Sequence, residues 1–101
     1  MRRKNQRLRG QVLEYRDASL LVLSKHLNSR QMSQIRVDGV KLRNGRVIIV
    51  FEDRLALVLD GDDALPLARL RQHTQSPSER FLNLASDSCV RKRLSDLRST
   101  L

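Results

Sequence analysis

The dipeptide Asn44-Gly45 lies between two apolar segments and constrains the fold more than any other local feature of the chain. A two-residue type I′ hairpin needs two residues with positive φ, and Asn followed by Gly supplies them at low steric cost. Val40 and Leu42 precede the dipeptide, and the apolar run 47–51 follows it. The sequence therefore predicts an antiparallel hairpin in the middle of the chain.

Three further segments favour β structure. Residues 55–59 form an apolar run that stops at the turn-forming residues 60–63. Nearer the N-terminus, residues 11–15 and 20–23 are compatible with strands, and residues 16–19 between them suit a turn. We therefore expect an antiparallel β-meander of four or five strands from about residue 10 to 60. Residues 28–34 have no clear period, and we interpret them as a loop or one helical turn.

The last quarter of the chain has the pattern of a helix. Ser76 and Glu79 match a capping box, with Pro77 at the first helical position. Further along, one apolar stripe is made by residues at intervals of four, three and four: Val90, Leu94, Leu97 and Leu101. Residues 86–88 could interrupt this helix. We expect the C-terminal helix to cover the sheet, and a shorter helix to span residues 64–71 with Pro66 in its first turn.

A chain of 101 residues has room for one small core. Hydrophobic residues make up 40% of it but include only one Tyr and two Phe, so Leu, Val and Ile must build that core. The predicted fold class is a small α+β domain, a β-meander packed by a C-terminal helix. It occupies residues 10–101, and residues 1–9 form a flexible basic arm.

Localisation follows from two absences in the sequence. No apolar run approaches the roughly 18 residues of a membrane span, and the polar start does not suit a secretory signal. Cys89 is the only cysteine, which excludes an intramolecular disulfide and fits a reducing compartment. We expect a cytoplasmic protein, with Cys89 buried on a helix.

Positive charge is the strongest functional signal, because 20 Lys and Arg against 11 Asp and Glu give a formal net charge of +9. Basic residues gather at the N-terminus, at the hairpin turn and near the C-terminus. Such groups bind phosphates with release of counterions. We expect nucleic acid to contact Arg2, Arg3, Lys4, Arg7, Arg9, Arg43, Arg46, Arg91, Lys92, Arg93 and Arg98. The acidic residues between 52 and 63 should face away from this contact.

The scarcity of aromatic residues predicts the mode of binding. Single-strand readers stack bases on exposed rings, and this chain has only three rings, of which Phe51 and Phe81 lie in apolar runs. Contacts should therefore be made to the phosphate backbone of RNA or DNA, without sequence specificity. We predict a small regulatory, ribosome-associated or viral accessory protein. The excess of Leu, Arg and Ser fits a GC-rich genome or a reading frame that overlaps another gene.

Enzymatic motifs are weak. Gly61-Asp62-Asp63 spells the GDD triplet of viral RNA polymerases, but one short domain cannot build a polymerase's channels. Asp38, Glu52 and Arg54 resemble the D…(D/E)-x-K pattern of metal-dependent nucleases, except that an arginine cannot accept a proton. The two histidines are far apart and lack metal-ligand spacing. We therefore expect a protein that is not an enzyme and that holds no metal or cofactor.

Two alternatives and one assembly state remain open. The main alternative is an interaction or inhibitor module that directs its charge at an acidic partner protein. Binding to an anionic membrane surface is less favoured, because the chain has no Trp. Exposed strand edges and the C-terminal apolar stripe predict a symmetric homodimer.

Overall fold

The computed structural model describes residues 2–51, 56–73, 79–84 and 86–99, and within residues 2–9 it describes the backbone alone. It belongs to the α+β class. In chain order the elements are α1 (Arg2–Leu23), α2 (Ser29–Gln34), the 3-10 helix η1 (Val37–Gly39), β1 (Val40–Arg43), β2 (Arg46–Val50), β3 (Ala56–Leu59), α3 (Gly61–Gln72) and α4 (Asp87–Ser99).

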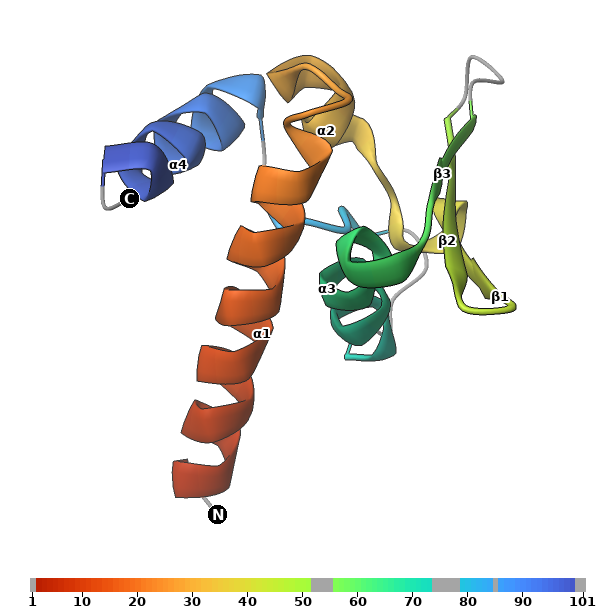
Figure 1. Cartoon of the computed structure of the whole chain (residues 1–101). Coiled ribbons are helices and arrows are strands. Elements are labelled where there is room, and N and C mark those ends of the chain that lie inside the picture. The colour runs from red at the N-terminus through yellow and green to blue at the C-terminus, as the bar shows by residue number, and fades with distance from the viewer. Residues whose placement is uncertain (1, 52–55, 74–78, 85, 100–101) are drawn as a thin grey trace.

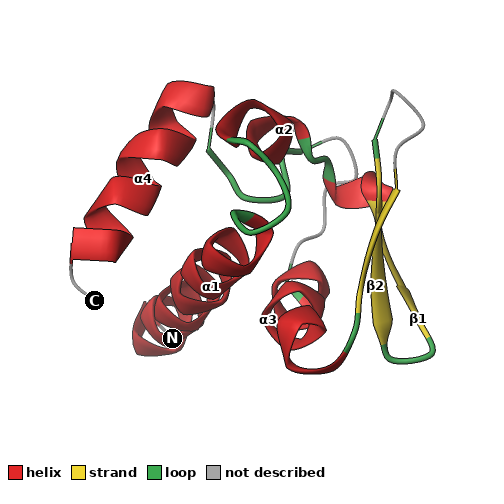
Figure 2. Cartoon of the chain, turned by 45° about the horizontal axis from the view of Figure 1, so that its top comes forward, coloured by secondary structure: helices red, strands yellow, loops and turns green. Residues whose placement is uncertain are grey.

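The elements are arranged in layers. Figures 1 and 2 both show α4 at one side of the molecule, the sheet at the other, and α1 and α3 between them. α3 packs against α1 and against β2, whereas α4 packs against α2 and α1. The sheet is therefore covered by α3, and the expectation that the C-terminal helix covers it is wrong.

The central hairpin is confirmed. β1 and β2 pair in antiparallel register with Val40 opposite Ile49, and the turn residues Asn44 and Gly45 have φ values of 52° and 76°. β3 pairs with the other side of β2, which confirms the third predicted strand over residues 56–59. The described residues contain one sheet of three strands, so the prediction of four or five is wrong.

The difference arises at residues 11–23, which belong to α1 and not to two strands and a turn. The side chains that α1 turns inward are spaced three and four residues apart, at Val12, Tyr15, Ser19 and Leu23. Ser19 is fully buried, and its hydroxyl donates to the Tyr15 carbonyl oxygen over 2.6 Å. Because Ser19 is polar, the apolar residues of this segment do not repeat at every inward position, and the helical spacing is not evident from the sequence.

The basic N-terminal segment continues the same helix. The backbone of residues 2–9, for which we expected a flexible arm, forms the first turns of α1. Among the described side chains of α1, the first one packed against the core is Val12. The division of the chain into an arm and a single domain at residue 10 stays a prediction.

Residues 79–84, which precede α4, are not helical, so the prediction that a helix starts at Ser76 and continues through them is wrong. Ser76 and Pro77 lie outside the described residues, but Glu79 and Phe81 pair with the chain near η1. The Val37 amide donates to the Glu79 carbonyl oxygen over 3.0 Å, and the Phe81 amide donates to the Ile35 carbonyl oxygen over 2.8 Å. A capping box does form elsewhere, between Asn28 and Gln31 at the start of α2.

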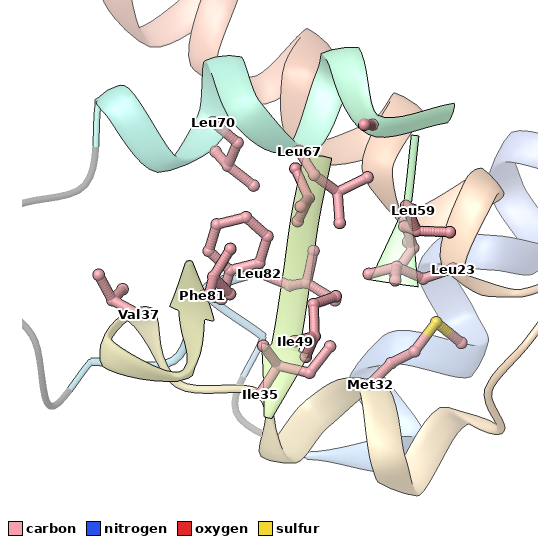
Figure 3. Packing of buried hydrophobic residues seen from close by; sticks show 14 of the residues in the cluster. Leu23, Met32, Ile35, Val37, Ile49, Leu59, Leu67, Leu70, Phe81 and Leu82 are labelled. Atoms are coloured by element: carbon pink, nitrogen blue, oxygen red, sulfur yellow. The ribbon is translucent and has the colours of Figure 1, made fainter. Parts of the chain in front are cut away.

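The core is mainly aliphatic, as the composition predicts. Its fully buried members come from the helices, from β2 and from the segment after Glu79, as Figure 3 shows for Leu23, Ile49, Leu67, Phe81 and Leu82. α3 starts at Gly61, earlier than predicted, so Pro66 lies inside the helix beyond its first turn. The GDD triplet thus forms the first turn of α3.

Candidate nucleic-acid interface

α4 has an apolar face that packs inside the molecule. Val90 is fully buried, Leu94 is 6% exposed, and Leu97 packs against the core. These residues confirm the first three positions of the predicted stripe, while Leu101 lies outside the described residues. α1 and α2 pack against α4, so Val90 and Leu94 are covered within one chain, and the homodimer stays a prediction.

An ion pair fixes α4 to α1. Arg93 Nε donates to Asp17 Oδ1 over 3.1 Å, and Arg93 Nη2 donates to Asp17 Oδ2 over 2.6 Å. Arg16 donates to the same carboxylate, with its Nη2 3.2 Å from Oδ1. The predicted site residue Arg93 therefore links α4 to α1, and its partner Asp17 is 76 residues away in the sequence.

This environment lowers the pKa of Asp17. Burial of the carboxylate raises its pKa, but the hydrogen bond from Arg93 and the charge and hydrogen bond of Arg16 together lower it below its ordinary value of 3.8. The same hydrogen bond and charge raise the pKa of Arg93. The pair is therefore ionised throughout the physiological pH range.

The opposite face of α4 is polar and basic. Arg91, Lys92 and Arg98 are exposed, and serines and the exposed Asp96 are interspersed among them along the helix. Arg91 contacts two residues of the first turn of α4, with its Nη2 3.5 Å from Ser88 Oγ and 3.8 Å from Asp87 Oδ2. Such an exposed pair contributes little free energy, so the guanidinium can exchange it for a phosphate. Guanidinium, ammonium and hydroxyl groups are the donors that phosphate oxygens accept from.

The basic start of α1 lies on the same side of the molecule. Both views show the first turns of α1 on the α4 side of α3, away from the sheet (Figures 1 and 2). The sequence places five basic residues there: Arg2, Arg3, Lys4, Arg7 and Arg9. Both groups therefore lie on the α4 side of α3, with the first turns of α1 at the end of that helix away from α4 (Figure 1).

The third predicted group lies on the other side. Arg43 and Arg46 are exposed at the hairpin turn, and a groove of about 320 Å³ separates this turn from the start of α3 at Gly61. Asp60 and Asp62 flank Gly61, so acidic residues lie beside the hairpin turn. The expectation that the acidic block faces away from the basic groups does not hold here.

The three aromatic rings are all at least partly buried. Phe81 is buried and Phe51 is half-buried. Tyr15 is also half-buried, and it stacks on His73 with ring centroids 5.7 Å apart. The Arg69 guanidinium carbon lies 5.7 Å from the centre of the Tyr15 ring. No ring is therefore presented to solvent as a platform for unstacked bases.

The other candidate residues are dispersed. Asp38 lies in η1, while Glu52 and Arg54 fall outside the described residues. Cys89 is exposed on α4, which corrects the expectation that it is buried, and its amide donates to the Ser86 hydroxyl. In the described ranges, no three His, Cys, Asp or Glu side chains are grouped as metal ligands would be.

Among the helices that the structure describes, none has the length and apolar character needed to cross a bilayer. No family model, no curated protein sequence and no solved structure matches this chain.

Proposed function

We propose that this protein binds the phosphate backbone of RNA or DNA through the exposed face of α4 and the basic first turns of α1. The observation that carries the proposal is the division of α4 into two faces. Val90 and Leu94 anchor one face in the core, while Arg91, Lys92 and Arg98 stand together on the other. A helix anchored in this way presents its cations without the entropic cost of ordering a loop.

Electrostatics supports a polyanion as the partner. The chain has a net charge of +9, and the acidic residues Asp60 and Asp62 lie at the start of α3, beside the hairpin turn and not beside α4. α4 carries four basic residues against Asp87 and Asp96, so the helix keeps a net charge of +2. Of the two acidic residues of α1, Asp17 is paired with Arg93 and Arg16, and Glu14 is exposed.

The mode is backbone contact without base readout. Arginine and lysine on one face of a helix bind phosphates through charge-assisted hydrogen bonds, which position a protein without specifying a sequence. Base stacking would need exposed aromatic rings, and Tyr15, Phe51 and Phe81 are all at least half-buried. A regulatory, ribosome-associated or viral accessory role is compatible with this binding.

Charge neutralisation in two places tests the proposal. The triple variant Arg91→Gln, Lys92→Gln and Arg98→Gln should bind a labelled duplex more weakly, and the slope of log K against log salt should fall by about 2–3. The matched control is Arg43→Gln with Arg46→Gln, which should leave the slope unchanged. All five side chains are exposed, so both variants should retain the wild-type melting temperature. An unchanged slope in the triple variant would reject α4 as the interface.

A further inference from the structure

The outward face of the sheet is apolar and uncovered by the helices that the structure describes. Strand alternation turns Val47 and Ile49 toward α3 and the core, and their neighbours point away from it. Figures 1 and 2 show α3 on the inner face and no labelled helix over the outer one. The outer patch consists of Ile48, Val50, Ala56 and Val58.

The outer patch is continuous across two strands. Ile48 is opposite Val58, and Val50 is opposite Ala56 in the register of β2 and β3. Val50 is 46% exposed and Val58 is 54% exposed. These four side chains are contiguous, unlike the scattered apolar residues that are normal on protein surfaces, and a patch of this size suits a short segment better than a large interface.

Positive charge borders the outer patch. In the register of β1 and β2, Lys41 is opposite Ile48 on the same outward face, and Arg43 and Arg46 form the next pair toward the turn. All three are exposed. Continuing the register of β2 and β3 places the exposed Asp60 opposite Arg46, so Lys41, Arg43, Arg46 and Asp60 together carry a net charge of +2.

From this combination we infer that the outer patch docks a short amphipathic segment of a partner protein, in which apolar residues are flanked by Asp or Glu. The apolar residues of the segment would cover Val50 and Val58, and its carboxylates would pair with Lys41 and the two arginines. Complementary charge of this kind selects the partner and its register more than it adds affinity.

Size argues against a second copy of the chain as the occupant. Three strands about 4.8 Å apart and four or five residues long, at about 3.3 Å per residue, give a face on the order of 200 Å². A stable dimer buries about 800 Å² on each partner. A short segment is matched to the smaller area, and it also avoids bringing two sets of basic residues together.

Nucleic acid is also a poor occupant of this face. The outer patch has no aromatic ring on which a base could stack. Phosphate groups are charged and hydrated, so contact with them would not transfer the aliphatic side chains to an apolar environment. The inference therefore concerns a surface separate from α4, and it can fail or succeed independently of the proposed function.

Designed peptides test the inference on the full chain. The probe is a peptide with Leu at every third or fourth position and Glu elsewhere. Its two controls are a scrambled peptide of equal composition and a peptide with Lys in place of Glu. In NMR titrations the acidic striped peptide should shift the signals of Ile48, Val50, Ala56 and Val58, and each control should bind about tenfold more weakly.

Two substitutions at the outer patch complete the test. Val58→Ser and Lys41→Glu should each weaken binding of the acidic striped peptide about tenfold, and both residues are exposed enough for the fold to survive. Leu13→Ser is the matched control, because Leu13 is 48% exposed on α1, and it should leave binding unchanged.

Several results would overturn the inference. They are equal binding of the scrambled peptide, no binding at millimolar peptide, and peptide-induced shifts confined to α4. Shifts of the outer-patch signals on addition of a nucleic-acid duplex, or on self-association of the chain, would also contradict it.

Discussion

Arg93 binds both carboxylate oxygens of Asp17 through one edge of its guanidinium group, with Nε 3.1 Å from Oδ1 and Nη2 2.6 Å from Oδ2. The two residues join α4 to α1, and the side chain of Asp17 is only 19% exposed. This two-point contact orients α4 so that Arg91 and Lys92 face outward. The residue that we expected to contact nucleic acid thus positions its neighbours.

Removal of the Asp17 charge should destabilise the fold. Asp17→Asn leaves Arg93 and the half-buried Arg16 without their anionic partner, and hydrogen bonds to charged groups contribute about 1.5–3 kcal/mol each. We expect the free energy of unfolding to fall by about 1–3 kcal/mol in urea titrations. In the separate variant Arg93→Lys only part of the stabilisation should be retained, because a lysine cannot make the two-point contact. A change smaller than the error of the titration would show that the pair of Asp17 and Arg93 does not contribute to stability.

The contribution of Asp17 to stability should depend on pH. Because the folded protein lowers the pKa of Asp17, its stabilisation is present above the unfolded value of about 3.9 and is lost as the pH falls through the folded value. The difference in unfolding free energy between the wild type and Asp17→Asn should therefore shrink below about pH 4. A difference that stays constant as the pH falls below about 4 would contradict the lowered pKa.

Two glycines should respond to alanine in opposite directions. A Cβ at Gly39 would lie 2.8 Å from the Val50 carbonyl oxygen, so Gly39→Ala should cost about 1–3 kcal/mol by forcing η1 away from β2. At Gly10 in α1 a Cβ would meet nothing within 4 Å, and Gly10→Ala should stabilise the helix by up to about 1 kcal/mol. Thermal unfolding of both variants checks this, and destabilisation by Gly10→Ala would contradict the helix at that position.

The sequence predicts those elements whose signals are local. Asn44 and Gly45 specify their turn by their own backbone preferences, and the hairpin and the third strand follow from them. The choice between helix and strand at residues 11–23 is not local. It depends on α3 and α4 packing against Tyr15 and Asp17, which are contacts that no short window of sequence contains.

Some residues of the candidate site could likewise be predicted from local sequence, and one could not. Arg91, Lys92 and Arg98 could be predicted because exposed basic residues on an amphipathic helix need no tertiary information. The pairing of Arg93 could not, since its partner is 76 residues away. The neighbouring sequence does not mark Asp17 out, since Glu14 is a second carboxylate in the same helix and is exposed.

The first turns of α1 should add to binding without adding to stability. Neutralising Arg2, Arg3 and Lys4 to Gln in the full chain should lower the salt slope by about 2–3, because each neutralised phosphate contributes about 0.9. Gln has a helix propensity similar to that of Arg and Lys, so the melting temperature should stay within about 2 °C of the wild type. Fluorescence anisotropy and thermal unfolding of one preparation measure both. A large loss of stability would show that these turns belong to the core.

The most direct test of the account is the affinity of the unmodified chain for a short labelled duplex, measured by fluorescence anisotropy over a range of NaCl concentrations. If α4 and the first turns of α1 contact phosphates, log K should fall linearly with log salt, with a slope between about −3 and −7 for the three to eight basic residues available. RNA and DNA of unrelated sequences should give similar values at equal salt. An absence of binding at low salt, or an affinity that does not change with salt, would contradict the account.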